Sequence, residues 1–171
     1  QALRGFMKKI KETNPAATEK TFILCMKGVE VSTGDRLSEV LIESGVKKEH
    51  IAVWVGPGHI QAFTQGIPNC MVIDSYSEEL KRRLCDEFTS PLIRFYYGED
   101  IIGTEIGAAA KNVMGIVAGM LDGCGFNALK GALMARGARE VARLIKAMGG
   151  NELSAYGLCH LGDYETTLFS P

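Results

Sequence analysis

Blocks of apolar residues separated by amphipathic segments run through the first hundred residues and predict strands that alternate with helices. The chain opens with a helical pattern whose apolar face is formed by Leu3, Phe6, Met7 and Ile10. Continuous apolar runs predict strands at residues 21–26, 51–55, 70–73 and 92–97. Helices are predicted at residues 35–44, 60–65 and 77–88, the first of them capped by Thr33 or Asp35. This alternation indicates a sheet that is buried on both faces and partly parallel.

The strand pattern stops near residues 98–100, and residues 101–121, 126–148 and 152–158 all have helical patterns. The chain is therefore expected to divide into an α/β unit, residues 1–98, and an all-α unit, residues 99–171.

A single lysine lies within the long apolar stretch from Ile101 to Gly125, with Asn112 beside it. Burial lowers the pKa of a lysine toward the range that proton transfer at neutral pH requires, so Lys111 is a candidate catalytic residue. An ammonium that reaches water past the helix and a membrane-spanning helix stay open as alternatives. Near a bilayer centre, Glu105 and Lys111 would each cost about 2.5–3.5 kcal/mol, and their spacing puts them on different helix faces, where they do not pair. Glycines at helix-contact spacing occur at positions 103 and 107 and at 115 and 119.

Composition excludes several function classes. The 171 residues are 46% hydrophobic with a net charge of −1, which gives no electrostatic case for binding nucleic acid or an anionic membrane. The five cysteines form no C-x-x-C pair, and four lie in apolar runs typical of reduced core cysteines, which indicates a reducing cytoplasm. The three histidines lack the spacing of zinc ligands, so no metal site is expected.

Two glycine-containing turns follow the first two predicted strands. One is Lys27-Gly28 and the other is Gly56-Pro57-Gly58. Ligands of α/β proteins collect at the carboxyl ends of strands, where such turns expose backbone N–H groups. Taken on its own, each turn is better explained by ordinary turn chemistry than by ligand binding.

Taken in order, the motifs resemble those of the NAD(P)-dependent glycerol-3-phosphate dehydrogenases over nearly the whole chain. The strongest stretch is D-I-I-G-T-E-I-G-A-A-A-K-N-V at residues 100–113. The others are M-K-G-V-E (26–30), T-G-D-R-L-S-E-V (33–40), V-G-P-G-H-I (55–60), G-I-P-N-C (66–70), G-M-L-D-G-C-G-F-N (119–127), A-R-G (135–137) and G-L-C-H-L-G-D (157–163).

This resemblance implies the C-terminal half of a Rossmann-type dinucleotide-binding domain followed by part of a helical domain like that of 6-phosphogluconate dehydrogenase. It implies hydride transfer between NAD or NADP and the glycerol 3-phosphate/dihydroxyacetone phosphate pair, with a small phosphorylated substrate as partner. The implied residue roles are catalytic acid/base for Lys111; substrate binding for Lys27, Gly56, Asn112 and Asp163; and cofactor binding for Lys27 and Ile60.

The chain departs from the family pattern at several positions. Gly58 replaces the family's Ser or Thr, His59 its aromatic residue and Ile60 its small residue. In the last motif His160 replaces a glycine and Tyr164 a leucine. His160 either reaches the substrate pocket or is a loop histidine with ordinary contacts.

The family's G-x-G-x-x-G motif and its S-R-N-like phosphate-binding motif do not occur in the sequence, and the chain has no initiator methionine. We therefore expect an internal fragment that is weakly active or inactive alone and that associates, for example as a homodimer, through the exposed core surface. Two alternatives are a related two-domain dehydrogenase for another small hydroxy or keto acid, and a non-catalytic remnant that acts as an interaction module.

Overall fold

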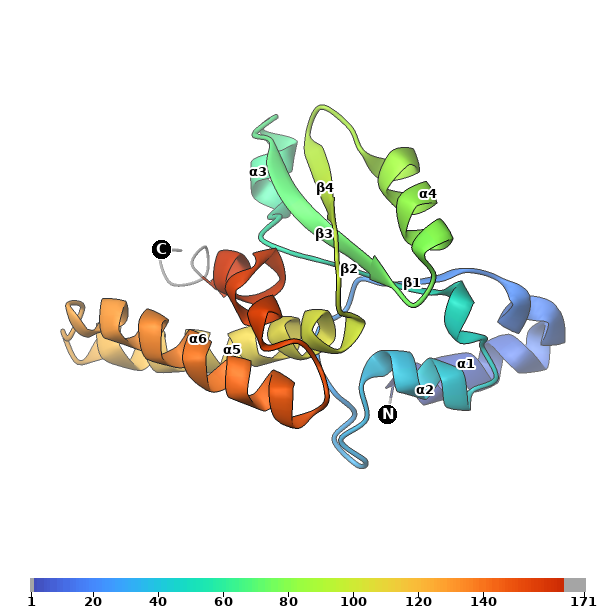
Figure 1. Cartoon of the computed structure of the whole chain (residues 1–171), viewed down its shortest axis with the longest axis horizontal. Helices are drawn as coiled ribbons and strands as arrows, with labels where there is room; N and C mark the ends of the chain where they lie inside the picture. Colours follow the sequence, from blue (N-terminus) through green and yellow to red (C-terminus); the bar gives the residue numbers. More distant parts are fainter. Residues whose placement is uncertain (1, 165–171) are drawn as a thin grey trace.

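The computed structural model describes residues 2–164 and contains a mixed four-stranded sheet (Figure 1). The strands are β1 (Phe22–Leu24), β2 (Ile51–Val55), β3 (Asn69–Ser75) and β4 (Ile93–Tyr97), in that spatial order. β1 pairs with β2 in parallel, β2 with β3 antiparallel, and β3 with β4 in parallel. The predicted partly parallel sheet is therefore confirmed.

Both faces of the sheet are covered. The helices of this part are α1 (Ala2–Thr13), α2 (Leu37–Glu43), α3 (Ile60–Thr64) and α4 (Glu78–Phe88), with 3₁₀ turns η1 (Pro15–Glu19) and η2 (Lys48–His50). Alternation along β2 sends Val53 into a core with α1 and α2, whereas Ala52 packs in a second core with Leu84 of α4. This two-sided burial explains why the strands have continuous apolar sequences.

The start of α2 differs from the sequence-based expectation. Arg36 is its N-cap residue, and the Glu39 carboxylate accepts a hydrogen bond from the Arg36 backbone N–H at 2.9 Å. Thr33 and Asp35 do not cap it, because both lie in the preceding loop and form hydrogen bonds within that loop. The Thr33 hydroxyl accepts from the Asp35 N–H and donates to the Glu30 carboxylate.

The second part of the chain is helical, as predicted. A long pair, α5 (Ile101–Gly123) and α6 (Leu129–Ala147), extends side by side away from the sheet (Figure 1). The predicted helix at 152–158 is wrong as a single element. It is a 3₁₀ helix, η3 (Glu152–Tyr156), followed by a π-helical turn, η4 (Leu158–Gly162), because the extended backbone of Gly157 interrupts it.

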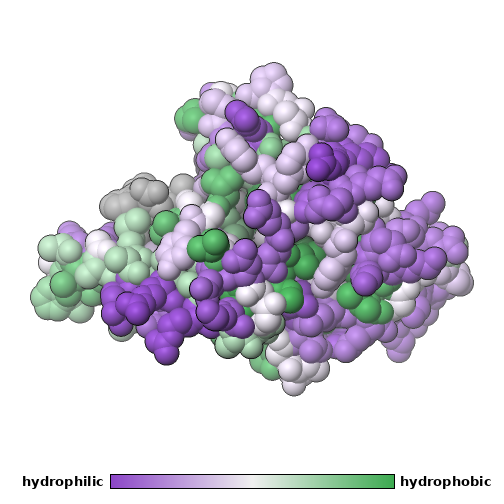
Figure 2. Space-filling model, in the orientation of Figure 1, coloured by the Kyte–Doolittle hydropathy of each residue, from purple (hydrophilic) through white to green (hydrophobic). Residues whose placement is uncertain are grey.

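Within residues 2–164, α5 is the helix long and apolar enough to cross a membrane by length and composition alone. A protein core gives rise to such a helix as well. The N-terminal half of α5 is buried, and Glu105 and Lys111 are each paired with a residue from another element. Exposed apolar residues gather at the far end of the α5–α6 pair, including Met120 and Phe126 (Figure 2).

The prediction of four core cysteines is only partly right. Cys85 and Cys159 are buried, Cys70 is half-buried, and Cys25 and Cys124 are exposed, all five as free thiols. Cys25 and Cys124 are exposed because each directly follows the end of its element, β1 and α5 respectively.

Candidate functional site

Three of the predicted site residues meet at one point, although they come from distant parts of the chain. Lys27 lies in the turn after β1, Lys111 in the middle of α5, and Asp163 directly after η4. The Lys111 ammonium donates to Asp163 Oδ1 at 2.5 Å, and the Lys27 ammonium donates to Asp163 Oδ2. Lys111 is 9% exposed and Asp163 1% exposed. One buried carboxylate is therefore shared by two ammonium groups.

The electrostatics of this group follow from crowding and burial. Burial lowers the pKa of Lys27, and the neighbouring Lys111 ammonium lowers it further, while the Asp163 carboxylate opposes both effects. Two cations around one anion leave a net positive charge on the group. That charge suits the stabilisation of an oxygen on which negative charge develops.

Gly28 and Gly56 allow the backbone turns that surround this group. Gly28 has φ +140° and Gly56 has φ +139°, which favour glycine. A Cβ on Gly56 would also lie 3.0 Å from the Cα of Met71. Because β1 and β2 are parallel, the turns that follow them lie at the same sheet edge. The arrangement fits a dinucleotide that approaches exposed backbone N–H groups at that edge.

The remaining predicted residues are Asn112, Gly56 and Ile60. Asn112 follows Lys111 on α5 and is exposed. Gly56 directly follows β2, and Ile60 begins α3 with 77% of its surface exposed. The bonds described above join Lys27, Lys111 and Asp163, and the roles of Asn112, Gly56 and Ile60 stay predictions.

His160 is buried rather than placed on a surface loop. Its Nδ1 lies 2.9 Å from the carbonyl oxygen of Gly107, and its ring stacks on Tyr164 with 5.7 Å between centroids. Burial lowers the pKa of His160, against the opposing effects of the Gly107 carbonyl and Asp163. The lowered pKa favours a neutral ring, whose Nδ1–H donates to Gly107 and fixes the η4 turn against α5.

Gly58 has a local packing reason. A Cβ at this position would lie 2.8 Å from Met71 Sδ and 2.9 Å from the Phe63 ring. The Met71 sulfur also accepts the Trp54 indole N–H at 3.0 Å. The Met71 and Phe63 side chains therefore occupy the space that a hydroxyl-bearing side chain at residue 58 would need.

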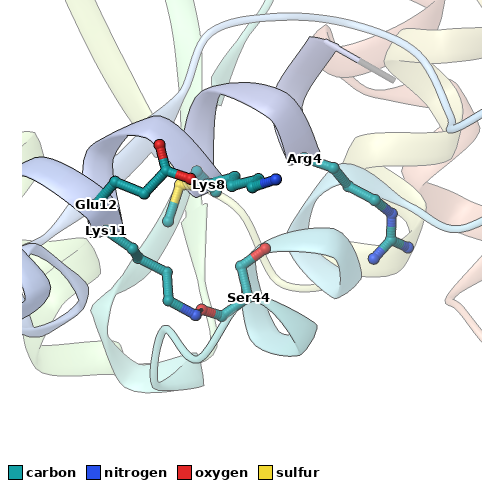
Figure 3. A pocket seen from close by; sticks show the side chains of 6 residues that line it. Arg4, Lys8, Lys11, Glu12 and Ser44 are labelled. Carbon is teal, nitrogen blue, oxygen red and sulfur yellow. Dashed lines mark hydrogen bonds between the residues drawn. The ribbon is translucent and has the colours of Figure 1, made fainter.

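Three cavities bear on ligand binding. One of about 170 Å³ adjoins Lys27 and Gly28, between α1 and α2. Another, of about 420 Å³, lies between the β3–β4 part of the sheet and the η3–η4 segment. A third, of about 380 Å³, lies between α1 and the end of α2. Figure 3 shows Lys11 in this cavity reaching toward Ser44, and the Lys11 ammonium donates a hydrogen bond to the Ser44 carbonyl oxygen at 3.0 Å. Only the first touches the two-lysine group.

Among residues 2–164, no group of three or more His, Cys, Asp or Glu side chains is arranged to hold a metal ion. Sequence reasoning found Lys111 from its place in an apolar helix, and assigned roles to Lys27, Lys111 and Asp163 through the family resemblance. It missed the partners of Glu105, which are Arg36 and Ser38. The available signal was Glu105 itself, an acidic residue within the apolar first half of the helix, since such a carboxylate needs a partner when buried.

Comparison with known proteins identifies the family of this chain. Residues 1–81 match the family model described as NAD-dependent glycerol-3-phosphate dehydrogenase N-terminus, and residues 100–171 match the C-terminus of the same family. Glycerol-3-phosphate dehydrogenase (NAD(P)+) of Moorella thermoacetica is 37% identical over 170 residues, 99% of this chain and 50% of the relative. The enzyme of the same name from Chlorobium limicola is 35% identical over 173 residues, 99% of this chain and 51% of the relative.

Solved structures show the same fold. The crystal structure of glycerol-3-phosphate dehydrogenase from Coxiella burnetii superposes with a TM-score of 0.89 at 24% identity, over 99% of this chain and 51% of that one. The glycerol-3-phosphate dehydrogenase of Plasmodium falciparum gives 0.88 at 19% identity, over 100% and 48%. The chain spans about half the length of the curated relatives it matches.

Proposed function

Because this chain belongs to the NAD-dependent glycerol-3-phosphate dehydrogenase family, we propose that the protein interconverts sn-glycerol 3-phosphate and dihydroxyacetone phosphate with NAD or NADP. The observation that supports this best is the buried Asp163 carboxylate shared by Lys27 and Lys111. In this proposal residues 1–98 form part of the dinucleotide-binding domain, and residues 99–171 form part of the helical domain.

The chemistry needs a proton donor and acceptor at the C2 oxygen of the substrate. The nicotinamide cofactor supplies or accepts the hydride. When a carbonyl is reduced, negative charge develops on its oxygen, and the Lys111 ammonium stabilises that charge and donates a proton. When an alcohol is oxidised, the neutral amine of Lys111 takes the proton back. Asp163 holds the lysine in place because its Oδ1 accepts a hydrogen bond from Lys111 Nζ at 2.5 Å.

The surrounding residues supply binding. In this proposal Lys27 contacts both the substrate and the nicotinamide side of the cofactor, which its half-buried place in the turn after β1 supports. Gly56 and Asn112 contact the substrate, and Ile60 contacts the cofactor. Charge repulsion between Lys27 and Lys111 raises the affinity of the group for an anionic substrate.

A direct assay tests the proposal. Dihydroxyacetone phosphate and unphosphorylated dihydroxyacetone are offered separately to the complete gene product, each with NADH and with NADPH, and cofactor absorbance is followed. Oxidation of the cofactor only with the phosphate ester supports the proposed reaction, and the faster cofactor identifies NAD or NADP. Turnover with neither substrate overturns it.

Two other functions are alternatives, and one of them has an observation in its favour. Gly58 and His160 depart from the family pattern, which favours a related two-domain dehydrogenase for another small hydroxy or keto acid. A panel of such substrates with both cofactors tests that alternative. The non-catalytic remnant predicts an ordered protein without turnover on any of them, and the intact ion pairs of Lys27, Lys111 and Asp163 oppose it.

The cellular setting belongs to the same proposal. We infer a cytoplasmic enzyme of glycerol phosphate and glycerophospholipid metabolism that binds no nucleic acid and spans no membrane. The net charge of −1 supports this setting, as do the buried ion pairs that Glu105 forms with Arg36 and Lys111 forms with Asp163. Self-association as a homodimer is supported by the exposed apolar residues at the far end of α5 and α6. Sedimentation of the protein over a concentration series tests it.

A further inference from the structure

A buried carboxylate lies on α5 between its N-terminus and Lys111. Glu105 is 6% exposed. Its Oε1 accepts from the Ser38 backbone N–H at 2.9 Å, and its Oε2 accepts from the Ser38 hydroxyl at 2.6 Å and from Arg36 Nη1 at 2.7 Å. All three donors belong to the start of α2. Glu105 thus satisfies a free N–H of α2 from another helix, as a capping side chain does from the same helix.

The start of α2 is rigidly connected to the turn that carries Lys27. Between them the chain forms a loop closed by a bridge between Val29 and Arg36 and by a 2.8 Å bond from the Glu30 N–H to the Asp35 carbonyl. A contact that fixes Arg36 therefore also fixes the backbone two residues from Lys27. The Glu105 cluster and the Asp163 group are two connections between the same loop and the same helix.

Buried ion pairs are poor evidence for stability, because desolvation offsets most of their attraction. Burial raises the pKa of Glu105, and the Ser38 hydrogen bonds and the Arg36 charge oppose that rise. What such a pair does supply is a defined register between elements. Apolar residues of α5 such as Ile101 and Ala108 also pack in this core, but such contacts are less directional than hydrogen bonds. A further directional bond of α5, from the Thr104 hydroxyl to Asp74 at 2.8 Å, goes to β3 and not to α2.

We propose that Glu105 is a positioning residue, which locks α5 to the start of α2 and so sets the separation between Lys111 on the helix and Lys27 on the loop. The expected effect of Glu105 on catalysis rests on the proposed function, whereas its effect on the separation of the two lysines does not. Without Glu105 the two ammoniums no longer meet the Asp163 carboxylate at the same time.

The test combines lysine labelling with kinetics in the complete gene product. The variants are Glu105→Ala, which removes all three bonds, and Glu105→Gln, which keeps a neutral acceptor for the Ser38 N–H. Leu84→Ala is the matched control, because Leu84 is 4% exposed and lies in the α4 core, which the two lysines do not touch. Acetic anhydride modification followed by mass spectrometry reports how well Lys27 and Lys111 are shielded.

We expect faster acetylation of both lysines in Glu105→Ala, a smaller increase in Glu105→Gln, and none in Leu84→Ala at a comparable loss of thermal stability. A lysine held in an ion pair keeps its proton and is shielded from the reagent. The value of kcat is expected to fall by about 10–100-fold in Glu105→Ala with a smaller change in KM, since a displacement of about 1 Å at a reacting group has an effect of this size.

Equal labelling of the lysines in Glu105→Ala and in the wild type overturns the proposal, as does a kcat that falls no further than in Leu84→Ala. If Glu105→Ala does not fold, Glu105→Gln and Ser38→Ala provide the same comparison. Increased labelling in a protein whose wild type turns over neither substrate supports the positioning role and overturns the proposed function, so the two failures are distinguishable.

Discussion

The Asp163 carboxylate lies 2.5 Å from the Lys111 ammonium, although 52 residues separate them in the chain. The same carboxylate binds Lys27, 136 residues away. This junction connects the turn after β1, the long helix α5 and the η4 turn. It is both the proposed catalytic centre and a tertiary contact, so its variants are expected to change activity and stability together.

Asp163→Asn tests the structural half of that statement. Removing the charge takes away the carboxylate that the buried Lys111 ammonium and the half-buried Lys27 ammonium share, and we expect the free energy of unfolding to fall by about 3–5 kcal/mol, as for other broken buried pairs. Denaturant unfolding at pH 7 measures this loss. Asp122→Asn is the control: Asp122 pairs with Lys130 but its side chain is 47% exposed, so a change within about 1 kcal/mol is expected. Equal losses of stability in the two variants would contradict the conclusion that Asp163 is a buried carboxylate shared by two lysines.

Lys111→Met tests the catalytic half. Methionine fills a similar volume but transfers no proton, so we expect kcat to fall by about 10²–10⁴-fold for the phosphate ester. Steady-state kinetics with the preferred cofactor measure the fall. Lys146→Met is the control, because the Lys146 side chain is 70% exposed and pairs with Glu152 on the surface. Near-normal turnover in Lys111→Met would show that another group transfers the proton.

Two glycines of α5, Gly107 and Gly119, are expected to respond to alanine substitution in opposite directions. A Cβ on Gly107 would lie 3.1 Å from His160 Cβ and 3.3 Å from Cys159 Sγ, so Gly107→Ala pushes against the η4 turn. We expect Gly107→Ala to lose about 1–3 kcal/mol and to lower turnover, because Asp163 moves with that turn. Nothing lies within 4 Å of a Cβ on Gly119, so Gly119→Ala is expected to gain up to about 1 kcal/mol.

Thermal unfolding of both glycine variants, followed by circular dichroism, makes this comparison. A stabilised Gly107→Ala variant with normal turnover would contradict the close packing of η4 against α5.

His160 makes stability depend on pH on the acid side. Burial lowers its pKa in the folded protein below the ordinary value of 6.5. In the unfolded chain it titrates near that ordinary value, so the unfolded state binds more protons below about pH 6.5. Stability is therefore lost as the pH falls from about 6.5 through the folded-state pKa, and this loss is complete below it.

His160→Asn keeps a hydrogen-bond donor near the position of Nδ1 but does not titrate. We expect its free energy of unfolding to depend less on pH below about 6.5 than that of the wild type. Urea unfolding at a series of pH values measures the difference. Parallel curves for the two proteins would show that His160 does not carry this dependence.

Local patterns in the sequence predicted most elements because each depends on neighbours along the chain. Apolar runs marked β2 and β4. The helix predicted at residues 77–88 begins at the cap of α4, where the Ser77 hydroxyl accepts from the N–H of Leu80, three residues on. The predicted cap of α2 was wrong: the N-cap residue is Arg36, and the free N–H of Ser38 is satisfied by Glu105, far away in the sequence.

The residue types of the site were readable in the same way, through the family resemblance and the single lysine in an apolar helix. The sequence did not show that these residues come together at one point. The sequence by itself determined that Lys111 lies in a long apolar helix and that Lys27 follows a strand, since both statements rest on local periodicity. Only the tertiary structure decided that Asp163 joins them and that Gly107, unlike Gly119, faces a neighbour. Periodicity fixes the faces of an element, whereas the partner of a face depends on how distant elements pack.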